Sequence, residues 1–268
     1  MITNLILYLK LFLGKRGIFI SRVTSRLQLD DFFRLIRPVK TNYDLVRFGS
    51  DLDGGYLIPE DLEGVDGCFS PGVSTTSDFE LEMANRGIKC FMADYSVDAP
   101  SLGHELFSFE KKFLGSYNDE IFMTLENWVS RNLPNGNEMI LQMDIEGYEY
   151  EVIMNTTSQM LKRFRIIVIE FHDLEQMLNK LGFVLIYQTF RKLLLDFEIV
   201  HIHPNNIMKA KRAIYKEYEI PSVIEVTFLR RDRITTMTTI KKFPHELDQL
   251  NSTAFDDYVL PKCWCNNK

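Results

Sequence analysis

Glu138-Met-Ile-Leu-Gln-Met-Asp-Ile-Glu-Gly-Tyr-Glu-Tyr-Glu151 is the stretch of sequence that decides the fold. Its apolar part, Met139–Met143, predicts a buried strand, and Gly147 predicts a turn into a helix. Two carboxylates, Asp144 and Glu146, fall where the strand ends. In an open α/β sheet, ligands bind at the carboxyl ends of the strands. The two acids are therefore candidates for a functional site, and the alternative is that they only cap the following helix.

A strand–loop–helix–strand unit precedes this stretch. Residues 65–70 predict a strand, residues 78–86 a helix, and residues 88–93 a second strand that ends at Asp94. The small residues of the loop Pro71–Thr76 allow a ligand to approach the backbone, and an acid at the next strand end can bind two ribose hydroxyls. The loop has one glycine where dinucleotide binders have three. A ligand with an adenosine but no pyrophosphate therefore fits better.

The chain downstream continues the alternation of strands and helices. Residues 165–171 form a continuous apolar run, as expected for a parallel strand that is covered on both faces. Further strands are predicted within residues 106–114 and at 197–203 and 223–229, and helices at 123–131, 147–155, 158–164 and 174–195, the last interrupted near Gly182. This pattern predicts an α/β fold with a mostly parallel, doubly wound sheet.

A second group of polar residues lies at the end of the strand 165–171. Glu170 and His172 should face the same rim of the sheet as Asp144, because the carboxyl ends of parallel strands meet there. His172 is a candidate general base, and the alternative is a histidine that is only hydrogen-bonded beside a helix. We expect His201 and His203 to lie on opposite faces of their strand, with His203 nearer the rim.

Composition excludes some classes of function. The chain has 268 residues, 46% of them hydrophobic, and a net charge of -6, so no overall basic field indicates a nucleic-acid partner. The four cysteines form no credible disulfide framework, and Cys263-Trp-Cys265 lacks the histidines or second cysteine pair of a zinc site. A reducing compartment, such as the cytoplasm, is the simplest inference.

The N-terminal run Met1–Leu13 is apolar and is followed by Lys15 and Arg16. It is too short to span a bilayer, and its charges are in the wrong place for a signal peptide. We expect an amphipathic helix that packs on the domain, on a second copy in a homo-oligomer, or on a membrane surface. We therefore separate residues 1–45, a helical segment, from residues 46–268.

Three segments resemble the FkbM-type family of S-adenosylmethionine-dependent methyltransferases. They are Leu141-Gln-Met-Asp-Ile-Glu-Gly-Tyr-Glu149, Met123-Thr-Leu-Glu-Asn-Trp-Val129 and Ile167-Val-Ile-Glu170. The resemblance covers roughly residues 69–172, and the loop Ser70–Thr75 departs from it by keeping one of the usual glycines. It implies a Rossmann-like class I methyltransferase fold with seven strands for residues 46–268. It also implies O-methylation, frequently of sugar hydroxyls in glycans or glycosylated metabolites.

The resemblance also implies roles for residues at the rim. Asp53-Gly-Gly-Tyr56 resembles a branch of the family, which adds Gly55 to the residues expected to bind the donor. The catalytic residues we expect are His172 as base and Asp144, and a Mg²⁺ ion is an option with Asp144 and Glu170 as ligands. The full set expected to bind S-adenosyl-L-methionine is Gly55, Gly72, Ser74, Asp94, Ser116 and Asp144.

Two other classes of function stay open from the residues alone. The cluster of Asp, Glu and His side chains also suits a metal-dependent hydrolase or another transferase. A catalytically silent binding domain could keep the sheet without the chemistry. Binding of the methyl donor and turnover on an acceptor separate the three.

Overall fold

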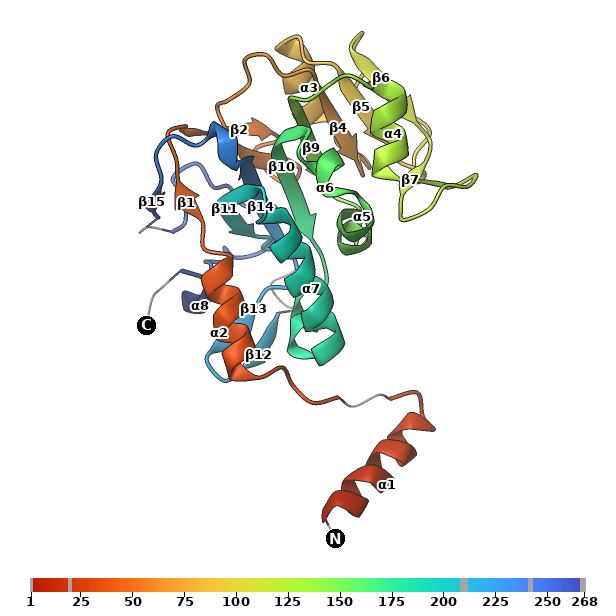
Figure 1. The fold of residues 1–268 in the computed structure, drawn as a ribbon, viewed down its shortest axis with the longest axis vertical. Helices are drawn as coiled ribbons and strands as arrows, with labels where there is room; N and C mark the ends of the chain where they lie inside the picture. The colour runs from red at the N-terminus through yellow and green to blue at the C-terminus, as the bar shows by residue number, and fades with distance from the viewer. Residues whose placement is uncertain (1, 19–20, 208–211, 241–242, 266–268) are drawn as a thin grey trace.

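The computed structural model describes residues 2–18, 21–207, 212–240 and 243–265 (Figure 1). Its central sheet consists of β4 (Gly67–Pro71), β5 (Cys90–Ala93), β6 (Phe107–Glu110), β9 (Met139–Met143), β10 (Phe164–Phe171), β11 (Phe197–Pro204) and β14 (Ile224–Arg230). The spatial order is β11-β14-β10-β9-β4-β5-β6. Adjacent strands from β6 to β10 are parallel, whereas β14 is antiparallel to both β10 and β11. The expected seven-stranded, mostly parallel α/β sheet is confirmed.

Most helices cover one face of this sheet. A large apolar core joins the sheet to α2 (Arg26–Leu35), α4 (Leu125–Asn132), α5 (Glu149–Asn155), α6 (Ser158–Leu161), α7 (Lys180–Leu193) and α8 (Lys262–Cys265). Trp128 of α4 packs in a T-shaped arrangement against Phe69 of β4, and Phe190 of α7 lies against Phe171 of β10. α2 belongs to this core, because its Phe32 is fully buried against Phe190.

The opposite face is covered differently. There α3 (Asp78–Asn85) packs beside the antiparallel hairpin of β2 (Leu45–Gly49) and β3 (Gly55–Pro59). Tyr56 and Phe48 of the hairpin contact Phe79 of α3. The doubly wound pattern predicted helices on both faces of the sheet. The second face has fewer of them, because the helices that follow β9 and β10 both pack on the first face. Asp53 and Gly54 lie in the turn of this hairpin.

The remaining elements are short, apart from the N-terminal helix. α1 (Ile2–Gly14) matches the predicted helix over its described residues, and Met1 lies outside them. None of the helices in the described ranges is long and apolar enough to cross a membrane. The other elements are β1 (Val39–Lys40), β7 (Phe113–Leu114), β8 (Phe122–Met123), η1 (Leu174–Leu178), β12 (Ala213–Tyr215), β13 (Tyr218–Ile220), η3 (Arg231–Arg233) and β15 (Thr238–Thr239).

Two local expectations were wrong. The break in the helical stretch after β10 falls at Asn179, not near Gly182, because the Asn179 side chain accepts the Gly182 N–H and starts a new helix there. His201 and His203 lie on the same face of β11, since residues two apart in a strand share a face. Both approach Asp248, at 2.9 Å and 3.7 Å.

Candidate active site

The carboxyl end of β9 meets the loop after β4 at the centre of the sheet. The Asp144 N–H donates a hydrogen bond to the Pro71 carbonyl over 3.2 Å. Gly72 has a φ of +87°, and a Cβ there would lie 1.5 Å from the Asp144 carbonyl oxygen. Glycine is required at this position, because no side chain fits between the two segments. The close approach places Asp144 directly beside the small-residue loop.

Glu149, the first residue of α5, holds the turn between β9 and α5. Its carboxylate is fully buried, and Oε1 accepts the N–H groups of Ile145 and Gly147, each over 3.1 Å. Glu146 and Gly147 both have positive φ, 55° and 104°, so these two hydrogen bonds stabilise a strained turn. The acid that satisfies the backbone before the helix is therefore Glu149. Asp144 and Glu146 are not needed for that purpose.

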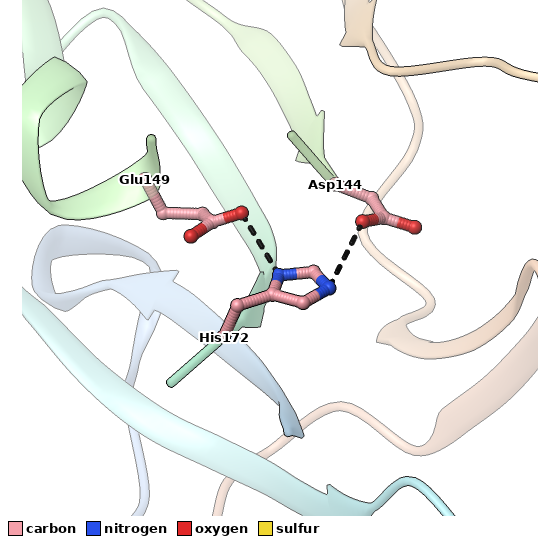
Figure 2. Close-up of side chains that lie close together, drawn as sticks. All are labelled: Asp144, Glu149 and His172. Carbon is pink, nitrogen blue, oxygen red and sulfur yellow. Dashed lines mark hydrogen bonds and ion pairs between the residues drawn. The ribbon is translucent and has the colours of Figure 1, made fainter. Parts of the chain in front are cut away.

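The ring of His172, which follows β10, lies between Glu149 and Asp144 (Figure 2). Its Nδ1 is 3.0 Å from Glu149 Oε1, and its Nε2 is 3.8 Å from Asp144 Oδ1 and 3.5 Å from Glu146 Oε2. The Tyr150 hydroxyl donates to the His172 carbonyl over 2.8 Å. The ring is thus fixed by Glu149 on one side and presents its other nitrogen to Asp144 at the rim.

The charges of this group shift two pKa values. Burial disfavours the charged His172 ring, but the hydrogen bond and charge of Glu149, with the charges of Asp144 and Glu146, raise its pKa from 6.5 to about 9. Burial raises the pKa of Asp144 from 3.8 to about 7 against the opposing charge of His172. At neutral pH the ring is therefore an imidazolium, and Asp144 is the group close to its titration point.

Two further acids extend the rim across the sheet. Glu170 of β10 lies opposite Glu225 of β14, and both are buried. Burial and the charge of Asp144 raise the pKa of Glu170 well above its usual range. Asn205 donates to Glu170 over 2.9 Å, and Asn251 donates to Glu225 over 2.7 Å. The rim therefore holds several carboxyl groups in an environment that disfavours their charge.

The residues that could hold a metal ion at the rim differ from those expected. Asp144, Glu149 and His172 offer ligand atoms that lie within 4.8 Å of one another. Glu170 lies outside this group. Two carboxylates and an imidazole suit a transition ion better than Mg²⁺, which prefers oxygen ligands. The His172–Glu149 contact has hydrogen-bond length. A hydrogen bond therefore explains why these two side chains lie close together without a metal ion.

Two adjoining cavities open at this rim. The first has a volume of about 310 Å³, and its walls include Asp94, Phe113, Phe122 and Tyr148. The second has a volume of about 130 Å³, and its acidic lining includes Asp53, Asp78 and Glu80. Both are also lined by Gly72, Ser74, Asp144 and Glu146. An apolar-walled cavity and an acidic cavity therefore adjoin at the loop after β4 and share part of their lining.

The structure brings four of the expected donor-binding residues together and leaves two apart. Asp94 Oδ2 accepts the Ser74 N–H over 2.9 Å, beside Gly72 and Asp144. Gly55 does not line either cavity, although its neighbour Gly54 lines the acidic one. Ser116 donates to Glu151 over 2.7 Å and is outside both cavities.

The central part of the chain matches a known family model. Residues 103–194 match the methyltransferase FkbM domain. The family resemblance is thereby confirmed over a segment that contains β9, β10, Asp144, Glu149 and His172. This FkbM match supports a methyltransferase. The loop after β4 and Asp94 lie before the matched segment.

The other comparisons add little. No curated protein matches the chain. Among solved structures, one match is the protein described under "Conversion of a Disulfide Bond into a Thioacetal Group during Echinomycin Biosynthesis". It is 14% identical, with a TM-score of 0.31, over 62% of this chain and 76% of that one. So low a likeness supports no inference about the site.

Proposed function

We propose that this protein transfers a methyl group from S-adenosylmethionine to an oxygen atom of its acceptor, which we take to be a sugar hydroxyl of a glycan or glycosylated metabolite. The observation that carries the proposal is the pair of adjoining cavities that share Asp144 in their lining, with the His172 ring beside that residue. The FkbM match over the same strand ends supports the reaction class. The sugar acceptor rests on the family resemblance.

The two cavities suit the two halves of the donor. Among the described residues, Ser74 is the only hydrogen-bond donor to Asp94 Oδ2, so this oxygen keeps a lone pair for a ribose hydroxyl. The aromatic walls of the same cavity, Phe113, Phe122 and Tyr148, can pack against an adenine ring. The acidic cavity would face the ammonium group of the methionine part. Gly72 lies at the border of the two, nearest Asp144.

The side chains at the rim have separate roles in this proposal. The donor, when bound, supplies an electrophilic methyl group on a positively charged sulfur. Asp144, with a pKa of about 7, accepts the proton of the acceptor hydroxyl. His172, held by Glu149, stays protonated and orients the Asp144 carboxylate. The earlier assignment of His172 as the base stays a prediction, and its pKa of about 9 favours Asp144 instead.

Isothermal titration with S-adenosylmethionine and with its demethylated product tests donor binding. Asp94→Ala should weaken binding by roughly 10- to 100-fold, since a hydrogen bond to a charged group contributes about 1.5–3 kcal/mol. Asp98→Ala is the matched control, because Asp98 is an exposed acid near the same strand end that pairs with Lys111. The proposal fails if the wild-type protein shows neither heat of binding nor a thermal shift.

Turnover tests the acceptor and the remaining alternatives. Release of the demethylated product in the presence of a glycan panel would identify the acceptor class. Donor binding without turnover on any acceptor would favour a silent binding domain. The metal-capable group of Asp144, Glu149 and His172 is the observation that keeps a metal-dependent hydrolase in view. Retained metal without donor affinity would favour that function, and turnover unchanged by EDTA would exclude a metal requirement.

A further inference from the structure

The helix α1 exposes large apolar side chains to solvent. Leu7, Tyr8, Leu9, Leu11 and Phe12 are between 52% and 72% exposed. Within residues 7–18, no side chain is buried. Such exposure is costly in water, at about 25 cal/mol for each Å² of apolar surface. The folded domain does not cover this helix, so a different surface is needed to do so.

The apolar side chains spread around the helix instead of forming one stripe. At about 100° per residue, positions 7 to 9 and 11 to 13 cover an arc of roughly 240°. Lys10 falls in the remaining arc. A partner helix or protein groove covers a stripe of roughly 100° and would leave much of this surface in water. The interface of a bilayer can bury a wide apolar face of a helix at the boundary between headgroups and acyl chains.

The basic residues near α1 also favour an anionic surface. Residues 1–29 contain five Lys and Arg and no Asp or Glu, so the other residues hold 26 basic and 37 acidic side chains, a net charge of -11. Arg26 pairs with Glu217, whereas Lys10 lies within the apolar helix and Lys15 and Arg16 follow directly after it. The Arg16 guanidinium lies 3.8 Å from the centre of the Phe12 ring.

We propose that α1 binds the surface of an anionic membrane. Thirteen helical residues are about 20 Å long, short of the roughly 30 Å hydrocarbon core, so the helix lies in the interface. Its apolar arc enters the acyl region, and Lys10, Lys15 and Arg16 contact lipid phosphates. The basic segment offsets the repulsion between anionic lipids and the acidic remainder of the chain.

Vesicle co-sedimentation of the full-length protein tests this proposal. Vesicles of phosphatidylcholine alone are compared with an equimolar mixture of phosphatidylcholine and phosphatidylglycerol, at low and high salt. The protein should sediment with the mixed vesicles, and high salt should release part of it. The combined change Lys10→Gln, Lys15→Gln and Arg16→Gln should lower this partitioning by on the order of 100-fold, at about fivefold per basic residue.

A second variant removes the apolar surface. Leu9→Ser, Leu11→Ser and Phe12→Ser together should abolish vesicle binding without changing the melting temperature, because these side chains are outside the core. The matched control is Leu181→Ser, Leu195→Ser and Phe255→Ser, which removes equivalent exposed side chains from the domain and should bind normally.

Three results would overturn the proposal. The first is absence of wild-type binding to the mixed vesicles, and the second is equal binding by the apolar α1 variant. The third is a dimer in light scattering that the apolar α1 variant converts to a monomer, since a second copy would then be the covering surface. None of these outcomes depends on methyl transfer.

Discussion

Replacement of Glu149 by glutamine should lower the pKa of His172. The Glu149 carboxylate is fully buried, 3.0 Å from His172 Nδ1. Burial alone disfavours the charged ring, and the hydrogen bond and charge of Glu149 are the largest effects that oppose it. Glutamine keeps the size and an acceptor oxygen but removes the charge. We therefore expect the pKa to fall from about 9 to near its ordinary value of 6.5.

The same change should alter how stability depends on pH. The rise from 6.5 to about 9 corresponds to roughly 3 kcal/mol, at 1.36 kcal/mol for each pKa unit. Because the pKa is raised in the folded state, this stabilisation is complete below pH 6.5 and is lost as the pH rises through 9. The loss of unfolding free energy in Glu149→Gln should thus approach ~3 kcal/mol near pH 6 and shrink above pH 9.

Two measurements check this prediction. An NMR titration of the five histidines gives the pKa directly, and His172→Gln identifies the relevant signal. Urea unfolding at several pH values gives the free energies. Glu151→Gln is the control, because Glu151 is an exposed acid of the same helix. A His172 pKa that stays near 9 in Glu149→Gln, or a stability loss that does not vary with pH, would refute the reasoning.

Three other predictions follow from the same contacts. Gly72→Ala should abolish donor binding and lower the melting temperature, because its Cβ would meet the Asp144 carbonyl, whereas Gly103→Ala, with open space around it, should be neutral in both assays. Asp144→Asn should reduce turnover by about 10²–10⁴-fold. The wild-type protein should lose unfolding free energy as the pH rises from 3.8 through about 7, because burial opposes the ionisation of Asp144 in the folded state. Asn cannot ionise, so urea unfolding above pH 7 should give a higher unfolding free energy for Asp144→Asn than for the wild type. In isothermal titration, S-adenosylmethionine should bind more tightly above pH 7 than below it, and the demethylated product, which lacks the sulfonium charge, should show the weaker dependence.

Local patterns predicted the strands well. The bounds of Met139–Met143 agree with the structure, because a continuous apolar run between polar residues has one consistent interpretation. The helix predicted at residues 123–131 is also present, as α4, and its N-cap is Thr124. The antiparallel direction of β14 was not predicted. Strand direction depends on the path of the connection, which here includes the β12–β13 hairpin, and not on the composition of the strand.

The site was predicted only in outline. Asp144 and His172 were assigned to one rim because parallel strands end together, and the structure places them there. Glu149 was missed as a partner of His172. Its only sequence signal was an acid at the start of a helix, whereas its contact spans 23 residues of the chain and depends on how α5 lies on β10. Tertiary contacts of this kind leave no local pattern.

The acids of the rim are better explained by a ligand than by the fold. Burial is the largest influence on Asp144, Glu170 and Glu225, and each has a raised pKa. Each therefore lowers stability as it ionises, and a fold selected for stability alone would have apolar side chains there. Helix capping does not require them, because Glu149 satisfies the turn. A positively charged ligand at the rim would reverse the effect by stabilising the ionised carboxylates. The sulfonium and ammonium groups of the proposed donor carry that charge.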